Sequence, residues 1–119
     1  MYSESVLDHF KNPRNAGVLA DATARVEVSN PVCGDILQLA AYAENGRIAA
    51  IRFRAQGCVT AVACASRLTE MVRDKTVAEA RGVTAQEIAA SLGGLETATF
   101  HGSQLAEDAL RELLDKLPL

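Results

Sequence analysis

The side chains best suited to bind a metal lie in three separate segments of this chain. Cys33 and Asp35 are two residues apart in a turn-like stretch, Cys58 follows a glycine, and His101 precedes another glycine. Two thiols, a carboxylate and an imidazole together are typical ligands of a soft or borderline metal. A glycine beside a ligand lets the backbone approach the ion closely. The pattern predicts a metal or sulfur site, provided that folding brings the three segments together.

Each of these residues also has a simpler interpretation when it is taken alone. Burial as a small apolar residue is the favoured interpretation of the remaining cysteine, Cys64. Burial explains Cys33 less well, because it lies among proline, glycine and aspartate, and Cys58 less well, because it begins a predicted helix. His101 alone fits a surface or capping residue, and Asp35 alone fits a turn. An odd cysteine count without a C-x-x-C pair disfavours disulfides and zinc ribbons.

The composition indicates one domain that acts on neither nucleic acids nor membranes. The 119 residues suffice for one hydrophobic core, so residues 1–119 are expected to form a single domain. The formal net charge of −3 disfavours phosphate backbones and anionic lipids as partners, and the absence of tryptophan leaves little for base stacking. The N-terminus lacks a signal-peptide pattern, and no apolar run could span a membrane. A cytoplasmic protein is expected.

The first half of the sequence predicts a short helix followed by three antiparallel strands. Ser3 or Ser5 is placed to cap the helix, and Pro13 ends it, because the residue before a proline avoids the helical conformation. Asn45-Gly46 supplies the tight turn of a hairpin between the second and third strands. The helix is expected over residues 6–10, a loop over 15–23, and the strands over 24–28, 36–43 and 47–55.

The second half of the sequence predicts helices. Thr84 and Glu87 match a capping box, Gly93-Gly94 ends the helix that they begin, and Ser103 is placed to cap the last helix. The helices are expected over residues 59–73, 76–81, 84–92 and 103–117. Strands first and helices afterwards indicate an α+β fold, a three-stranded antiparallel sheet with helices packed on one face.

The third strand indicates which face of the sheet stays exposed. Ile51 and Phe53 alternate with Arg52 and Arg54, so the arginines should lie on the side away from the helices. On the same reading the candidate ligands fall at element boundaries. Cys33 and Asp35 lie between the first two strands, Cys58 between the third strand and the long helix, and His101 just before the last helix. Such boundaries can converge into a shallow, accessible site.

Five stretches of this chain strongly resemble the IscU/NifU-type iron–sulfur cluster scaffolds. They are residues 2–15 (YSESVLDHFKNPRN), 30–35 (NPVCGD), 56–61 (QGCVTA), 68–72 (LTEMV) and 105–109 (LAEDA). The match covers nearly the whole chain in order. The resemblance implies the same α+β fold. It also implies that a transient [2Fe–2S] cluster is built from iron and from sulfur delivered by a cysteine desulfurase, then passed to apo-proteins.

The resemblance also implies a ligand set and one departure from it. Scaffolds of this family carry three cysteines, an aspartate and a histidine at the metal end, and Cys33, Asp35, Cys58 and His101 match four of these positions. Gly102 stands where the third cysteine belongs, and glycine can neither bind iron nor accept sulfur. Cys64 is no replacement, because six helical residues place it about 9 Å along the axis from Cys58 and on another face.

A second departure lies just before the predicted histidine ligand. Scaffolds served by a dedicated Hsp70-type chaperone carry a Leu-Pro-Pro-Val-Lys stretch there, whereas this chain has LETAT over residues 95–99. Release of the cluster by that chaperone is therefore not expected. The remaining four donors suit tetrahedral Zn²⁺ or Fe²⁺, and could also hold a [2Fe–2S] unit that is more labile than one held by thiolates alone.

Three hypotheses remain open on the sequence. The favoured one is an assembly scaffold with a weakened ligand set. The second is a zinc-binding relative that builds no clusters and regulates or partners a cysteine desulfurase. The third is an interaction domain whose site has decayed, although loss of a single ligand favours the first two. Without a Gly-rich phosphate loop, enzymatic catalysis is not expected. The chain is expected to be a monomer or a weak homo-oligomer.

Overall fold

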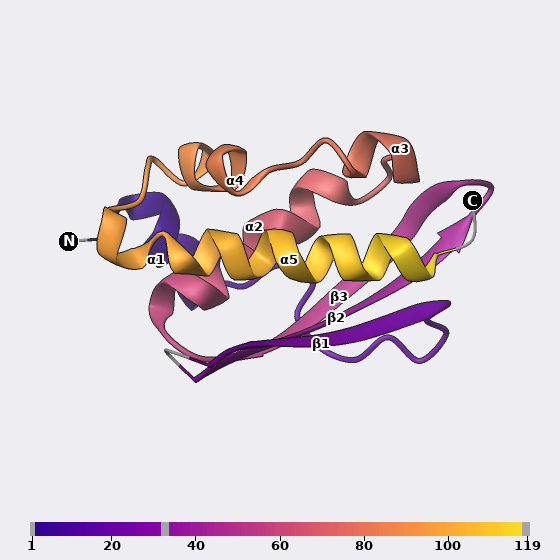
Figure 1. Cartoon of the computed structure of the whole chain (residues 1–119), viewed down its shortest axis with the longest axis horizontal. Coiled ribbons are helices and arrows are strands. Elements are labelled where there is room, and N and C mark those ends of the chain that lie inside the picture. Colours follow the sequence, from indigo (N-terminus) through magenta and orange to yellow (C-terminus); the bar gives the residue numbers. More distant parts are fainter. Residues whose placement is uncertain (1, 32–33, 118–119) are drawn as a thin grey trace.

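The computed structural model describes residues 2–31 and 34–117. One antiparallel sheet forms a layer, and the helices gather on one side of it (Figure 1). In chain order the elements are α1 (Glu4–Lys11), β1 (Ala24–Asn30), β2 (Asp35–Glu44), β3 (Arg47–Gln56), α2 (Val59–Val72), α3 (Val77–Ala80), α4 (Ala85–Ser91), the 3-10 helix η1 (Thr97–Thr99) and α5 (His101–Lys116). The predicted α+β class is confirmed. Among the described residues, no helix is long and apolar enough to cross a membrane.

The sheet has β2 in the middle, paired antiparallel with β1 on one side and β3 on the other. The predicted hairpin turn is confirmed: Asn45 and Gly46 have φ angles of 54° and 76°, the left-handed values that a two-residue turn requires. Leu39 pairs with Val26 and Phe53 to form one buried row across the three strands. The register is therefore set by the turn and by the buried face together.

The two faces of the sheet differ as the sequence predicts. Ile51 and Phe53 are buried against the helices, whereas Arg52 and Arg54 are exposed on the other face. The core between the layers is completed by leucines of α2 and α5, among them Leu68, Leu110, Leu113 and Leu114, each no more than 1% exposed. In Figure 1, α5 runs along the length of the sheet. This contact places the first turn of α5 at one end of the strands.

Several element boundaries differ by a few residues from the sequence-based expectations, and two of these differences bear on the site. Asp35 is the first residue of β2, paired with Asn30, and not part of a loop. His101 is the first residue of α5 and does not precede the helix; Ser103, expected as the cap, lies inside the helix and is buried. Helix α5 begins early because η1 leads directly into it, and the Ser103 hydroxyl donates instead to the Phe100 carbonyl at 2.8 Å.

The capping box of the shorter helices lies at a different place from the one that the sequence predicts. Ser3 caps α1 as predicted. At α4, the Thr84 side chain accepts a hydrogen bond from the Glu87 backbone N–H, but the Glu87 carboxylate accepts from the Thr84 hydroxyl and not from its backbone N–H. The complete reciprocal capping box belongs to Thr76 and Glu79 at the start of α3. The same sequence signal occurs at both places, but of the two only the box of Thr76 and Glu79 has both reciprocal hydrogen bonds.

Candidate metal centre

The candidate site lies at the end of the sheet where β2 begins, β3 ends and α5 starts. Asp35 is only 3% exposed, and its carboxylate lies against the connection between β3 and α2. The Cys58 backbone N–H donates to Asp35 Oδ1 at 3.3 Å. A Cβ atom on Gly57 would come within 2.4 Å of the same oxygen. Glycine at position 57 is therefore required for the carboxylate to occupy this place.

Cys58 is held in the site by its role as the N-cap of α2. Its backbone is extended, with φ −72° and ψ 166°, and its Sγ atom accepts from the Ala61 backbone N–H at 3.4 Å. The cap fixes the direction of the side chain, because the sulfur must lie over the first turn of the helix to accept this hydrogen bond. The predicted position of Cys58, between β3 and α2, is confirmed.

His101 completes a group of three donors that face one another. The Cys58 Sγ atom lies 3.7 Å from Asp35 Oδ2 and 3.8 Å from His101 Nε2, and that nitrogen lies 3.6 Å from Asp35 Oδ2. Tetrahedral zinc with bonds of about 2.0–2.3 Å has ligand-to-ligand distances of about 3.3–3.8 Å. The three donors are thus within a few tenths of an ångström of the spacing that one ion needs. Their chemistry and geometry fit a single Zn²⁺ or Fe²⁺ ion.

Access to this group differs among its members. Asp35 is buried, whereas the His101 side chain is 29% exposed and Cys58 is half-buried. A groove of about 590 Å³ lies beside His101 and is lined in part by Pro31, Leu95 and Phe100. Another molecule can therefore reach the imidazole side of the site without unfolding of the protein.

Gly102, which stands in place of an expected cysteine, packs tightly against α2. It is buried, and a Cβ atom there would lie 3.1 Å from both Cγ2 and the carbonyl carbon of Thr60, and 3.2 Å from the Ala61 nitrogen. These distances are shorter than ordinary carbon–carbon contacts of about 3.5–4.0 Å. The glycine allows the first turns of α5 and α2 to touch, so a third thiol would need one of them to move.

The other two cysteines have different outcomes. Cys33 lies outside the described residues, so its predicted part in the site stays a prediction. Cys64 is fully buried in the hydrophobic core, and burial raises the pKa of its thiol to about 12. The interpretation of Cys64 as a core residue is confirmed, and a buried neutral thiol of this kind is not a metal ligand.

His9, a residue of helix α1, belongs to a second polar cluster outside the candidate metal centre. It is 6% exposed, its Nδ1 atom lies 2.7 Å from the Ser66 hydroxyl, and its Nε2 atom lies 3.2 Å from Glu70 Oε1. Ser66 also accepts from the Arg14 backbone N–H at 2.9 Å. Ser66 is 57 residues from His9 and 52 residues from Arg14 along the chain. No local sequence pattern could therefore predict these contacts.

Comparison with known proteins gives a consistent answer. The family described as "NifU-like N terminal domain" matches residues 1–118. The chain is 45% identical over 114 residues to the iron-sulfur cluster assembly scaffold protein IscU 1 of Archaeoglobus fulgidus, covering 96% of this chain and 74% of that protein. It is 42% identical over 111 residues to the scaffold protein IscU of Aquifex aeolicus, covering 92% and 71%.

Solved structures agree with the fold. The N-terminal part of a nitrogen-fixing NifU-like protein from Brucella abortus superimposes with a TM-score of 0.73 at 16% identity, covering 95% of this chain and 91% of that one. The five sequence stretches, the sheet with helices on one face and the match over nearly the whole chain point the same way. This chain belongs to the NifU-like N-terminal domain family.

Proposed function

We propose that this protein is an iron–sulfur cluster assembly scaffold that holds a transient [2Fe–2S] cluster and passes it to apo-proteins. The observation that carries the proposal is the convergence of Asp35, Cys58 and His101, whose donor atoms all lie within 4.8 Å of one another. Cys33 would be the fourth donor in this proposal. The names of the IscU relatives support the assignment, because they describe assembly scaffolds.

The donor set suits a cargo that must leave again. Cys58 supplies the soft sulfur that iron prefers, and an imidazole such as His101 can replace a thiolate on cluster iron. Asp35 is a hard oxygen donor, which binds iron of a cluster less firmly than a thiolate does. The half-open side at His101 gives an acceptor a route to the cluster. The protein holds and orients its cargo in this scheme, and the proposed role is not enzymatic.

The scheme requires a sulfur donor and acceptors. In it a cysteine desulfurase supplies the sulfur, and the acceptors are apo forms of iron–sulfur proteins. Without a thiol at position 102, sulfur would have to arrive at Cys58 or Cys33. We place this activity in the cytoplasm, because the free thiols of Cys58 and Cys64 fit a reducing compartment.

A second candidate function is a zinc-binding relative that regulates or partners a desulfurase. The observation that favours it is the tight packing of Gly102 on Thr60, because a third thiol at position 102 would require α2 or α5 to shift. A site with two thiolates, an imidazole and a carboxylate suits tetrahedral Zn²⁺ well. Both candidates use the same residues, so they differ in cargo and not in location.

Anaerobic reconstitution separates the two candidates. The purified metal-free protein is incubated with ferrous iron, L-cysteine, a catalytic amount of a cysteine desulfurase, and dithiothreitol as the reductant that converts persulfide sulfur to sulfide. Its visible spectrum and native mass are then recorded. The scaffold proposal expects visible absorption of a [2Fe–2S] chromophore and a mass increase of two iron and two sulfide. On addition of an apo-ferredoxin, this added mass should leave the protein and appear on the ferredoxin, together with the chromophore. The native mass also counts subunits.

The control is Cys58→Ser, which keeps an N-cap oxygen at the start of α2 but removes the soft donor. A chromophore that forms equally in this variant would contradict the assignment of the site. One equivalent of tightly bound zinc with no chromophore would favour the second candidate. No binding of either metal would reject both.

A further inference from the structure

The face of the sheet opposite the helices carries a concentration of positive charge. A hollow of about 450 Å³ lies over the middle of this face, and its cationic side chains come from β1, β3 and the end of α5. They are Arg25, Arg52, Arg54 and Lys116, and the one acidic side chain beside them is Glu27. Four cations and one carboxylate give a local formal charge of +3, on a chain whose formal net charge is −3.

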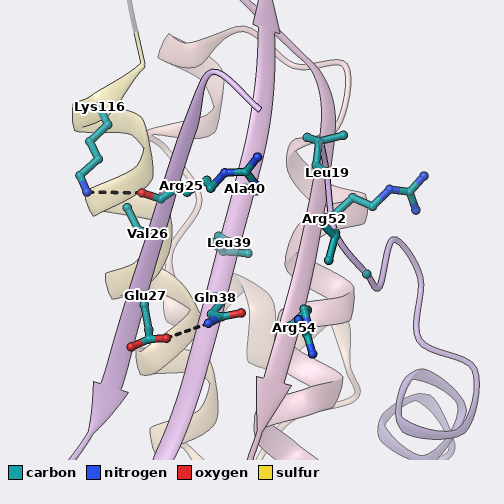
Figure 2. Close-up of a pocket in the computed structure, with 12 residues that line it drawn as sticks. Leu19, Arg25, Val26, Glu27, Gln38, Leu39, Ala40, Arg52, Arg54 and Lys116 are labelled. Carbon is teal, nitrogen blue, oxygen red and sulfur yellow. Dashed lines mark hydrogen bonds between the residues drawn. The ribbon is translucent and has the colours of Figure 1, made fainter. Parts of the chain in front are cut away.

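Strand pairing arranges these charges in two rows across the sheet. In the first row Ala40 of β2 lies between Arg25 and Arg52, so a small side chain separates two guanidinium groups. In the second row Gln38 lies between Glu27 and Arg54. Figure 2 shows both rows, with Arg25 reaching toward Ala40 in the middle of the sheet. The hollow exists because alanine stands between the arginines.

The arginines of β3 are not neutralised within the described part of the chain. Glu27 is already held by Gln38, whose Nε2 donates to its carboxylate at 2.7 Å. Arg25 donates to the Ala20 carbonyl at 3.3 Å, whereas Arg52 and Arg54 take part in no ion pair or side-chain hydrogen bond between described residues. Both are exposed. Two exposed guanidinium groups, carried by alternate residues of β3, are thus available to carboxylates from another molecule.

The spacing of these two arginines suits an extended peptide. Arg52 and Arg54 are alternate residues of one strand, so their α-carbons are about 6.6–6.8 Å apart, which is also the spacing of alternate residues in an extended partner segment. Apolar surface lies beside the charges: Leu19 and Ala40 line the hollow, and Val18 is 67% exposed. A segment that alternates acidic and small apolar residues would match both features.

The surface continues toward the candidate metal centre. A second hollow of about 220 Å³ shares Glu27, Gln38 and Arg54 with the first and extends to Gln56 at the end of β3. Gln56 lies two residues before Cys58. A partner bound along this face would therefore end close to the site.

We propose that the exposed sheet face around Arg52 and Arg54 docks an acidic, extended segment of a partner protein, whose carboxylates pair with the two guanidinium groups. Charge complementarity selects this occupant. A nucleic acid or an anionic membrane presents a broad field of phosphates, which the net negative charge of the chain and the carboxylate of Glu27 disfavour. Separate carboxylates on one peptide segment avoid that repulsion. The proposal does not depend on the metal site and goes beyond the proposed function.

The test measures binding of a fluorescein-labelled peptide of alternating glutamate and valine to the metal-free protein by fluorescence anisotropy. The same peptide with glutamine in place of glutamate is the ligand control. We expect the acidic peptide to bind, the glutamine peptide to bind at least about tenfold more weakly, and the affinity to fall with added salt as exposed charges are screened. Amide shifts in NMR spectra should map to β3 and residues 17–19.

Matched variants test the residues themselves. The double variant R52E/R54E should weaken the acidic peptide by at least about tenfold, and R52Q/R54Q by a smaller factor. The double variant R73E/K75E reverses the same number of exposed charges outside this face and should change affinity by less than about threefold. Circular dichroism checks that all variants fold.

Three results would overturn the proposal. The first is equal binding of the acidic and glutamine peptides, and the second is equal weakening by R52E/R54E and R73E/K75E. The third is tighter binding of phosphatidylserine vesicles or single-stranded DNA through the same two arginines, which would assign a phosphate-bearing occupant. Failure of cluster assembly leaves all three measurements unaffected, so the two proposals can fail separately.

Discussion

Two clusters in this protein join a histidine to a carboxylate and to a hydroxyl or thiol, namely His9–Glu70–Ser66 and His101–Asp35–Cys58. In the first, the distances are 2.7 and 3.2 Å, which are ordinary hydrogen bonds. In the second, His101 Nε2 and Asp35 Oδ2 are 3.6 Å apart, too far for a hydrogen bond, and the two contacts of the Cys58 sulfur, at 3.7 and 3.8 Å, are weak hydrogen bonds. The first cluster is held by short hydrogen bonds, whereas the donor atoms of the second lie near one another with only longer contacts between them.

The difference in contact distances fits different roles for the two clusters. The first cluster connects α1 to α2 across the helical layer, and Arg14 adds a further hydrogen bond to the Ser66 hydroxyl. Its contribution is to stability. The second connects the ends of three elements through longer contacts, which is consistent with the metal site that we propose. On the proposed function, similar side chains therefore have a structural role in the first cluster and a ligand-binding role in the second, and the distances between their atoms differ accordingly.

The strongest test of this comparison is Cys58→Ser, which we expect to lower the affinity for Zn²⁺ by about 100-fold or more, because a soft donor is lost. The unfolding free energy of the metal-free protein should change by less than about 0.5 kcal/mol, since serine is also a good N-cap. Competition with a chromophoric chelator measures the affinity, and denaturant titration measures the stability. Unchanged zinc affinity would remove the distinction between the clusters.

The reverse experiment is Ser66→Ala in the other cluster. It leaves His9 Nδ1 and the Arg14 backbone N–H without their buried partner, so we expect a loss of about 2–3 kcal/mol in unfolding free energy. Zinc affinity should change by less than about twofold. Thermal unfolding and the same chelator competition check both values. A large loss of zinc affinity would mean that the two clusters are coupled through α2.

Gly102→Cys sharpens the comparison at the site itself. The new Cβ would press on Thr60, so we expect a loss of about 1–2 kcal/mol in stability and no increase in cluster yield after reconstitution, because the thiol enters only by moving the first turn of α5. Gly102→Ala should show the same loss of stability without the thiol. Gly82→Ala, at an exposed glycine with its nearest contact at 3.4 Å, is the control. A higher cluster yield in Gly102→Cys would show that the missing thiol limits assembly.

The smallest expected effect is the pH dependence that His9 gives to stability. Burial, aided by the nearby Arg14 guanidinium, holds the pKa of His9 below its ordinary value of 6.5. Below pH 6.5 the His9 side chain binds a proton more readily in the unfolded chain than in the folded protein. The contribution of neutral His9 to the unfolding free energy is therefore complete above pH 6.5 and is lost as the pH falls toward the folded pKa. Unfolding free energies at pH 7.5 and 5.5 should therefore differ more in the wild type than in His9→Gln. An equal difference in both would exclude His9 as the cause.

Local signals predicted most of the fold. Alternation placed Ile51 and Phe53 inside and Arg52 and Arg54 outside, and Asn45-Gly46 predicted the hairpin, because both features depend on neighbouring residues only. The start of α5 was misplaced, because η1 continues into the helix and no side chain marks the boundary. Three of the four predicted ligands meet in space, and Cys33, the fourth, lies outside the described residues.

The sequence by itself determined the family, the order of the elements and the identity of the donor side chains, since these follow from residue types and short spacings. Only the tertiary structure decided that Asp35, Cys58 and His101 converge, that Gly102 touches Thr60, and that His9 is buried. The physical reason is that these contacts join residues 23 to 66 positions apart in the chain, so no local pattern contains them. They depend on how closely the helices and the sheet pack, and differences of a few tenths of an ångström decide whether the donor atoms are spaced for hydrogen bonds or for an ion.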